Sequence, residues 1–473
     1  MSTHSPVIAT DPPLAPGRVK LLGHLPRLAR DPIGYLGSLS SVGEVVGLRI
    51  ANRPVYVVTS PELVRALLVE HASVCTRGSI FRKAGQVMGQ GLVIAEGSLH
   101  RRQRRLVQPA FHQRRIERYA DTMAEVAAAH SRSWQDGRPF EAAAQLHAMG
   151  LEMICRGLFR SGLAEHAAAR VERAVPAVVR GIIWRTLYPA DWLERLPIPV
   201  NRRFDRARQV LHTVVDEIIT TYRATEPEEG DVLALLLDAR DQDSGQPMSD
   251  EQLRDEIVTL ILTGTETTAT TLAWLFHELD HHPEVDERLA AELTEVLGDR
   301  PVRFEDLARL PYTGQVLKET LRLHTPNWLL TRRATREFRL GRHRIPAGAE
   351  LLFSLTALHR DPALYPDPRR FDPDRWTAER SAGLPSHAFL PFGAGKHKCI
   401  GDVFAMTEML VAAATVLRDW RPVHTDSGRP VGERPWTTVQ PGGLRLTPLA
   451  RRRFPRQRQG GPEGPSRSGP GTG

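Results

Sequence analysis

The loop Phe392-Gly393-Ala394-Gly395-Lys396-His397-Lys398-Cys399-Ile400-Gly401 carries one cysteine among three glycines and leads into the apolar helical segment 404–417. A loop that precedes a helix surrounds a sulfur atom with backbone N–H groups and the positive end of the helix dipole. We therefore expect a lowered pKa for the Cys399 thiol. The glycines leave room for a large flat ligand to approach the backbone. From the cysteine alone, the alternative is a small buried apolar residue beside a turn.

Length and composition indicate a globular protein. The 473 residues are 41% hydrophobic and 25% charged, with a net charge of +8, which excludes fibrous and wholly disordered chains. Residues 19–449 contain no linker, repeat or low-complexity run, so we expect one large domain between a flexible segment 1–18 and a disordered tail 451–473. The tail holds six arginines and one glutamate. It lacks the aromatic interleaving of a nucleic-acid-binding arm, so we expect a solvated tail and no nucleic-acid partner.

Three cysteines, Cys75, Cys155 and Cys399, are too few for a disulfide framework or a four-cysteine zinc site. They favour a reducing compartment. The sequence contains no run of about 18–20 apolar residues, the length of a membrane-spanning helix, and its N-terminus lacks the layout of a signal peptide. We expect a cytoplasmic protein without a transmembrane anchor.

The hydrophobic periodicity predicts a mainly α protein with small β-sheets. Apolar residues recur at helical spacing in 119–134, 210–222 and 251–281, β-branched runs predict a hairpin at 45–50 and 55–59, and 339–353 reads as two strands around a turn. The proline-rich segment 362–391 predicts an irregular, tightly turned meander.

Further motifs extend the cysteine loop into a family pattern. Glu319 and Arg322 are spaced i, i+3 on one helix face, and Arg375 lies in Phe371-Asp-Pro-Asp-Arg-Trp376. In isolation the pair would be an ordinary surface ion pair. Together with the cysteine loop, these residues resemble the cytochrome P450 family, in which the three form a buried ion network. The resemblance covers nearly all of 19–449 and implies the P450 fold, a single large helical domain around haem.

The resemblance implies haem b, with the Cys399 thiolate on the iron, where it favours O–O cleavage. His397 stands where the family usually has arginine, so its charge toward a haem propionate would depend on pH. His100 replaces the tryptophan of a Trp-x-x-x-Arg helix. The implied cofactor-binding residues are His100, Arg104, Arg332, Phe392, Gly393, His397, Cys399 and Gly401.

The stretch Thr263-Gly-Thr-Glu-Thr-Thr268 lies inside a long apolar helix, where polar residues are costly unless they are used. In the resembled family, a groove at this glycine holds oxygen. The resemblance implies Glu266 as proton source and Thr267 as the hydrogen-bonding gate. Thr263 stands where the family usually has alanine or glycine, so it narrows the groove or contacts substrate. The alternative is that these hydroxyls bond back to the preceding helical turn.

The implied activity is insertion of one oxygen atom of O2 into a C–H or C=C bond of a hydrophobic small molecule. Thr263, Trp328 and Leu329 are candidate pocket residues, within the mostly apolar segments 80–95, 175–196 and 326–330. The strings 100–111 and 328–334 resemble actinobacterial members that oxidise cyclic sesquiterpenes in the pentalenene and albaflavenone pathways. They favour a terpenoid of secondary metabolism and antibiotic biosynthesis, oxidised in one or more rounds at one carbon. Fatty acids, polyketides and steroids are the alternatives.

Electrons are expected from NAD(P)H through ferredoxin reductase and ferredoxin, because no segment is long enough for a fused flavin reductase. An acidic ferredoxin would dock on a basic surface. Its candidate residues, which could equally form a solvated basic face, are Arg101, Arg102, Arg105, Lys396 and Lys398.

Two alternatives come from other classes of protein. His277-Glu278-Leu279-Asp280-His281 matches His-Glu-x-x-His, the pattern of a zinc hydrolase, with Glu292 or Glu295 as third ligand. Pro283 ends the helix directly after the motif, which argues against it. A haem protein that only binds ligands is the second alternative. Glu266 and Thr267 argue against it, because a binder needs no proton path.

Overall fold

The computed structural model describes residues 10–51, 53–159, 161–188, 191–224 and 231–451. Residues 1–9 of the expected flexible segment, and all of the expected tail except Arg451, lie outside the described residues.

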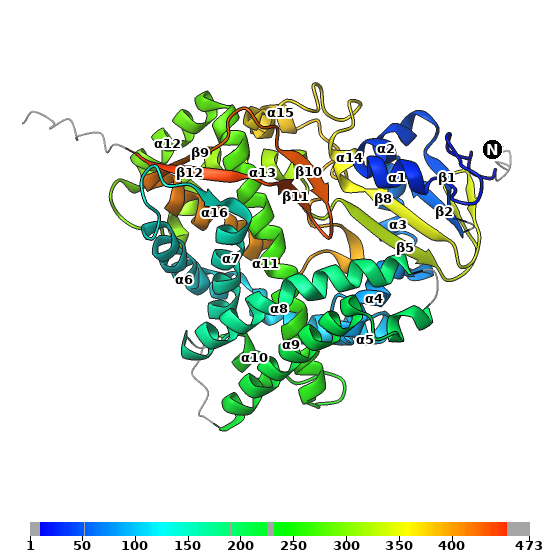
Figure 1. Cartoon of the computed structure of the whole chain (residues 1–473), viewed down its shortest axis with the longest axis horizontal. Coiled ribbons are helices and arrows are strands. Elements are labelled where there is room, and N and C mark those ends of the chain that lie inside the picture. The colour runs from blue at the N-terminus through cyan, green and yellow to red at the C-terminus, as the bar shows by residue number, and fades with distance from the viewer. Residues whose placement is uncertain (1–9, 52, 160, 189–190, 225–230, 452–473) are drawn as a thin grey trace, which may run out of the picture.

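Helices make up most of the described chain (Figure 1). Their bounds are α1 Leu25–Arg30, α2 Pro32–Ser38, α3 Pro61–Val69, α4 Ser79–Met88, α5 Gly97–Val107, α6 Gln113–Arg132, α7 Ala142–Leu158, α8 Ser161–Leu187, α9 Pro199–Ala224, α10 Val232–Asp238, α11 Asp250–His281, α12 Pro283–Leu297, α13 Pro311–Leu323, α14 Leu355–His359, α15 Ala378–Ser381 and α16 Asp402–Asp419. Short 3-10 helices include η4 Asp191–Arg195, η6 Pro373–Trp376 and η7 Gly395–His397.

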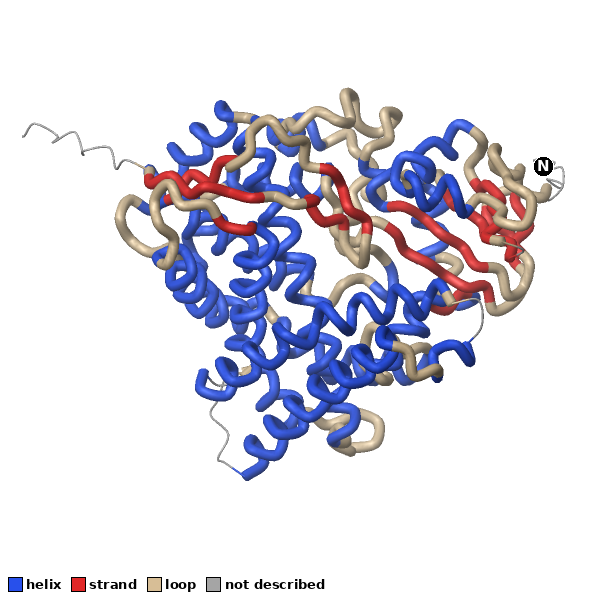
Figure 2. Tube along the Cα trace, in the orientation of Figure 1, coloured by secondary structure: helices blue, strands red, loops and turns tan. Residues whose placement is uncertain are grey.

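The strands form small sheets along one part of the molecule, drawn in red in Figure 2. Their bounds are β1 Val45–Ile50, β2 Arg53–Val58, β3 Cys75–Arg77, β4 Phe140–Glu141, β5 Leu329–Ala334, β6 Phe338–Leu340, β7 His343–Ile345, β8 Glu350–Ser354, β9 Trp420–His424, β10 Gly432–Pro435, β11 Val439–Gly442 and β12 Arg445–Ala450. The largest sheet has the order β1-β2-β8-β5-β3, and a second has the order β4-β12-β9. The mainly α class with small β-sheets is therefore confirmed.

Helix α11 crosses the middle of the helical part and packs against α7, α9 and α16 (Figure 1). It begins with a capping box in which the Ser249 hydroxyl and the Gln252 side chain bond each other's backbone N–H groups. It ends at His281, because His282 precedes Pro283 and residues before proline avoid helical geometry. This helix carries both polar motifs singled out above.

Most expected elements lie where the patterns put them. The hairpin is β1–β2, and the long segment 251–281 is α11. The segment 339–353, expected as two strands, holds parts of three: most of β6, all of β7 and most of β8. Part of the N-terminal segment that we expect to be flexible lies against the sheet, since Ala15 N–H donates to Gly47 O (2.9 Å) and Gly47 N–H donates to Pro13 O (2.7 Å). Pairing through backbone groups leaves no side-chain pattern in the sequence.

Among the described residues, the helices lack the combination of length and hydropathy that a bilayer span requires.

Candidate active site

The cysteine loop is fixed by its own backbone. Cys399 N–H donates to Phe392 O (2.9 Å), and Gly393 and Gly395 have φ of +69° and +70°. A Cβ on Gly395 would lie 2.1 Å from Leu68 O of α3, so only glycine permits this close approach. The loop is thereby held against α3, with the free thiol of Cys399 near its end.

The pKa of Cys399 is raised, in the direction opposite to our expectation. The surrounding atoms desolvate the thiol, and this effect outweighs the Gly401 N–H and the positive charges of Arg104 and Lys398, which act to lower the pKa. Desolvation of the thiol therefore outweighs the helix dipole on which the expectation of a lowered pKa was based. A metal ion that binds the sulfur would deprotonate it outright, so the loop suits a thiolate that forms upon metal binding.

Two arginines face each other beside this loop. Arg77 in β3 is the register partner of Arg332 in β5. Arg332 is buried, and burial lowers its pKa; burial and the nearby Arg332 charge lower the pKa of Arg77 to about 9. Like charges directly opposite across a sheet are unfavourable. The carboxylate of Glu96 compensates part of this charge, because its field raises both pKa values.

His100 and His397 lie next to the arginine pair. His397 Nδ1 is 3.1 Å from Arg77 Nη2, which donates to it, and 3.3 Å from His100 Nε2. Burial, together with the neighbouring positive groups, lowers the pKa of each histidine to about 4. Both imidazoles are therefore neutral at pH 7. Arg77, which the sequence did not single out, supplies the positive charge that arginine usually provides at the position of His397.

Arg104 connects helix α5 to the cysteine loop, since its Nη1 donates to Lys398 O (2.8 Å). It thus holds the peptide that precedes Cys399. Phe392 is partly buried and packs against the main core cluster. A Cβ on Gly401 would lie 3.4 Å from the ring of Phe111, an ordinary van der Waals contact.

These groups fit a haem. Within the described residues, the buried Nε of Arg77 has no hydrogen-bond partner. A group with a metal for Cys399 and carboxylates for Arg77 and Arg332 would compensate both buried charges and supply that partner. Neutral His100 and His397 can donate to the same carboxylates.

The hydroxyls of the Thr263–Thr268 stretch bond back to the preceding turn. Thr267 Oγ1 donates to Thr263 O (3.1 Å), with a longer contact to Gly264 O (3.4 Å), and Thr263 Oγ1 donates to Thr259 O (2.8 Å). A Cβ on Gly264 would lie 2.8 Å from Ile154 Cδ1 of α7. The glycine therefore permits close packing of α7. The Thr267 oxygen keeps lone pairs with which to accept a further hydrogen bond.

Glu266 lies beside Thr267 in sequence, but its carboxylate is held elsewhere. It accepts hydrogen bonds at 2.8–2.9 Å from Thr437, Thr438 and Gln440, in and next to β11. The side chain is buried. These three partners are more than 170 residues away in the chain, so no local sequence pattern predicts them. These hydrogen bonds hold the carboxylate of Glu266 toward β11.

The structure brings Glu319, Arg322 and Arg375 together in the interior. Arg322 Nε and Nη2 donate to the two Glu319 oxygens at 2.9 and 2.7 Å, and Arg375 Nε is 3.4 Å from Glu319 Oε1. Glu319 also accepts from Trp376 Nε1 (2.9 Å). Arg322 donates further to the carbonyls of His359 and Pro368. The network ties α13 to the meander, and it is buried rather than on the surface.

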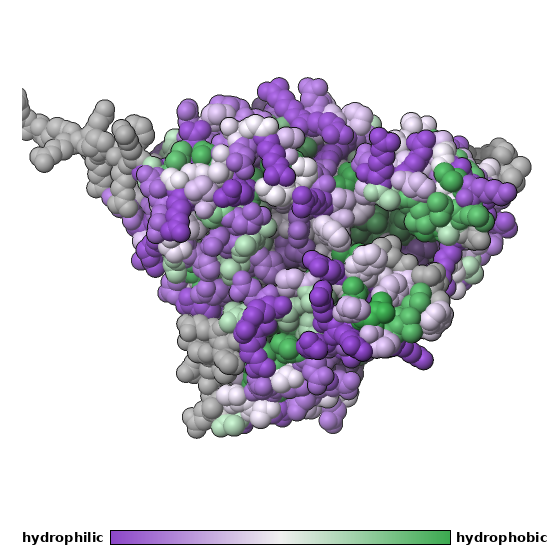
Figure 3. Space-filling model, in the orientation of Figure 1, coloured by the Kyte–Doolittle hydropathy of each residue, from purple (hydrophilic) through white to green (hydrophobic). Residues whose placement is uncertain are grey.

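The candidate pocket residues Trp328 and Leu329 differ in how deeply they are buried. Trp328 is buried in the third core cluster, and its Nε1 donates to Trp436 O (3.0 Å). Leu329 is partly buried at the start of β5 and packs against the same cluster. Figure 3 shows hydrophobic side chains, in green, around a hollow between the five-stranded sheet and the helices α4 and α8. On this face of the molecule, an apolar ligand would approach through this hollow.

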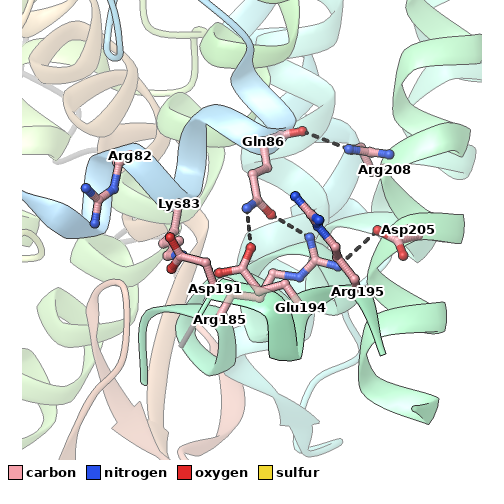
Figure 4. A pocket seen from close by; sticks show the side chains of 9 residues that line it. All are labelled: Arg82, Lys83, Gln86, Arg185, Asp191, Glu194, Arg195, Asp205 and Arg208. Atoms are coloured by element: carbon pink, nitrogen blue, oxygen red, sulfur yellow. Dashed lines mark hydrogen bonds and ion pairs between the residues drawn. The ribbon is translucent and has the colours of Figure 1, made fainter. Parts of the chain in front are cut away.

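Segments 80–95 and 175–196, expected to line an apolar pocket, meet around a polar cavity of about 500 Å³ (Figure 4). Gln86 of α4 bonds Arg185 of α8 and Glu194 of η4. Lys83 donates to Asp191 (2.7 Å) and also to Glu194. Some apolar residues of these segments, Val87, Met88, Val175, Val178 and Ile182, are buried in the main core, whereas Trp184, Trp192 and Leu196 are exposed. The lining of this cavity is therefore polar, and it does not have the apolar character expected of a substrate pocket.

The expected basic face is partly neutralised. Arg102 pairs with Asp241 (3.2 Å), Arg105 with Asp243 (2.6 Å) and Lys398 with Asp402 (2.5 Å). Arg101 and Lys396 are exposed. The net positive charge of this surface is smaller than the sequence suggests.

The His-Glu-x-x-His motif lacks the parts of a hydrolase. Glu278 Oε1 is bonded to His324 Nε2 (2.6 Å), so it does not face a water between His277 and His281. The expected third ligand Glu292 instead accepts two backbone N–H bonds at the start of α13. Among the described residues, Glu292 and Glu295 do not join the two histidines in a metal-binding cluster; His424 does.

Comparison with known proteins gives a single answer. A model of the family "Cytochrome P450" matches residues 12–446. The chain is 42% identical to cyclooctatin synthase of Streptomyces melanosporofaciens, over 93% of this chain and 95% of that one. It is 38% identical to pentalenene oxygenase of Streptomyces avermitilis, over 95% and 99%. The crystal structure of the cytochrome P450DA heme domain matches with a TM-score of 0.85 at 25% identity, covering 94% of this chain and 100% of that one.

Proposed function

Because this chain belongs to the cytochrome P450 family, it is a haem-thiolate monooxygenase, and we propose that its substrate is a terpenoid. The similarity to cyclooctatin synthase and pentalenene oxygenase over nearly the whole chain carries this proposal. The hollow surrounded by hydrophobic side chains in Figure 3 supports the proposal, because a hydrocarbon substrate needs an apolar route into the protein. We assign residues 19–449 to the haem domain.

Cys399 is the proposed iron ligand, with Arg77, Arg332, His100 and His397 on the haem carboxylates. The convergence of these side chains beside one loop supports the assignment. When bound, haem supplies the activation of O2 that lets one oxygen atom enter an unreactive C–H bond. Arg104 positions the loop through Lys398 O.

Thr267 and Glu266 are the proposed proton-handling residues. The Thr267 hydroxyl can donate its proton and accept another one at Oγ1. The backbone carbonyl of Thr263, to which it now donates, need not move for this transfer. Glu266 would relay a proton from the side of Thr437 and Gln440, after rotating away from them. In this structure the hydroxyl of Thr437 donates to both oxygens of that carboxylate.

The proposed electron donor is a ferredoxin reduced by NAD(P)H through a ferredoxin reductase. The exposed Arg101 of α5 and Lys396 of the cysteine loop suit a small acidic protein. The described cysteines are all free thiols, which fits a reaction in the reducing cytoplasm.

The substrate class is tested with haem-loaded protein. Pentalenene and lauric acid are titrated separately into the ferric form while the haem absorption spectrum is recorded, and turnover with NADPH, ferredoxin and reductase is followed by gas chromatography and mass spectrometry. We expect a spectral shift and an oxygenated product with the terpene and a much weaker response to the fatty acid. Efficient oxidation of the fatty acid, without terpene turnover, would overturn the terpenoid assignment.

A further inference from the structure

Three histidines that the haem site does not use meet at the C-terminal end of α11. His277 and His281 lie one turn apart on α11, and His424 ends strand β9. His277 Nδ1 and His424 Nε2 are 2.9 Å apart, and one nitrogen from each of the three rings lies within 4.8 Å of the others. The cluster contains two imidazoles of the His-Glu-x-x-His motif and a third that is 147 residues from His277.

The surrounding hydrogen bonds orient these rings. His281 Nδ1 lies 2.9 Å from His277 O, and a carbonyl only accepts, so Nδ1 carries the proton and Nε2 carries the free lone pair. Asp280 Oδ2 accepts from the backbone N–H of His424 (3.2 Å), which fastens β9 to α11.

We propose that His277, His281 and His424 bind one zinc ion. Three imidazole nitrogens without a thiolate, at a site open on one side, suit a tetrahedral Zn²⁺ with water as fourth ligand. Zinc–nitrogen distances of about 2.0–2.1 Å place neighbouring ligand nitrogens about 3.4 Å apart in a tetrahedron. The separations in the cluster, from 2.9 Å up to 4.8 Å, bracket that value. The exposed His281 gives the ion a route from solvent.

The bound zinc would have a structural role and would not form a hydrolytic centre. Glu278, the base that such a centre would need, is bonded to His324. The ion would join α11 to the β4-β12-β9 sheet, adding to the contact that Asp280 makes with β9. Ten residues separate Thr267 from His277, about 15 Å along the helix, so the site is distinct from the haem pocket and does not rest on the proposed function.

The test uses haem-loaded protein without a histidine tag, treated with chelator and dialysed. Zinc stoichiometry is measured by mass spectrometry of the metals, with iron counted separately, and affinity is measured by competition with a coloured chelator. Cobalt(II) replaces zinc in a second experiment, in which visible absorption reports tetrahedral coordination. The variants are H281A, which removes an exposed ring, and H424A. The control is H112A, which removes an exposed histidine that makes no helix-capping bond.

We expect one zinc per wild-type chain, tetrahedral cobalt absorption, and a melting temperature that rises with zinc. H281A and H424A should each weaken zinc binding by more than roughly tenfold, since loss of even an outer-sphere partner costs about that much. H112A should bind as the wild type does, and iron content should be the same in all proteins. Absence of stoichiometric zinc in the wild type, or equal binding by H281A and the wild type, would overturn the proposal. If H424A does not fold, the zinc affinity of H281A compared with that of the wild type still decides the proposal.

Discussion

Replacing Glu319 by glutamine removes the carboxylate that both buried guanidinium groups, Arg322 and Arg375, contact. Glu319 and Arg322 have no exposed side-chain surface, and Arg375 has 6%. Arg322 contributes two hydrogen bonds, and the Asp372 N–H and Trp376 indole contribute one each. The amide keeps one acceptor oxygen, but its NH2 group faces donors.

Removing one partner of a buried ion pair costs about 3–5 kcal/mol. We therefore expect E319Q to lower the free energy of unfolding by about 4 kcal/mol, about a thousandfold in the unfolding equilibrium constant. The matched control is E70Q, because Glu70 forms an exposed ion pair with Arg65 at 2.8 Å. That pair should contribute less than about 1 kcal/mol.

Urea-induced unfolding of the haem-loaded proteins, followed by far-UV circular dichroism, measures the difference. A much lower urea midpoint for E319Q than for E70Q is the expected result. If the two variants unfold within about 1 kcal/mol of each other, the network does not hold α13 to the meander as the buried geometry requires.

Further predictions concern the haem carboxylates, proton handling and acid stability. R77L should weaken haem binding about 10–100-fold, the loss of one charge-assisted hydrogen bond, as measured by haem transfer to a scavenger globin. T267A should bind substrate normally but consume more NADPH per product, whereas T271A, which removes a hydroxyl one turn later, should not. Partial burial raises the pKa of Glu433, but hydrogen bonds from His324 and Arg360 outweigh it and lower the pKa to about 2. The folded-state pKa lies below the ordinary 4.5, so this stabilisation is complete above pH 4.5 and is lost as the pH falls toward 2. E433Q should thus cost up to about 3 kcal/mol at pH 7 and progressively less in acid.

Each of these predictions has a result that contradicts it. Unchanged haem transfer from R77L would remove Arg77 from the cofactor site. If T267A and T271A consume the same amount of NADPH per product, the Thr267 hydroxyl has no role beyond its hydrogen bond to the helix backbone. A destabilisation by E433Q that stays constant between pH 7 and pH 3 would contradict the lowered carboxyl pKa.

Local spacing was enough to predict part of the site. Glu319 and Arg322 share a helix face at any i, i+3 spacing, and α11 is visible as a long apolar repeat. The resemblance to the cytochrome P450 family then predicted Cys399 as the iron ligand and predicted the fold, because three glycines at these positions around a cysteine are a rare combination. The backbone confirms the need for one of them, Gly395, which lies against Leu68 O.

Contacts between distant segments could not be predicted. Arg77 faces Arg332 through the register of a three-residue strand that leaves no pattern in the sequence. His424 reaches His277 from a strand 147 residues later, and Thr437 reaches Glu266 across 171 residues. Helical periodicity predicts which face a residue occupies, but not which distant chain covers that face.

The carbon monoxide difference spectrum of the reduced protein tests the central claim most directly, with wild-type protein and C399S measured side by side. The wild type should show the band at about 450 nm of a ferrous haem with a thiolate ligand, and C399S should lose it while its far-UV circular dichroism is retained. The same band in C399S, or no haem in the wild type, would contradict the assignment of Cys399 as the iron ligand.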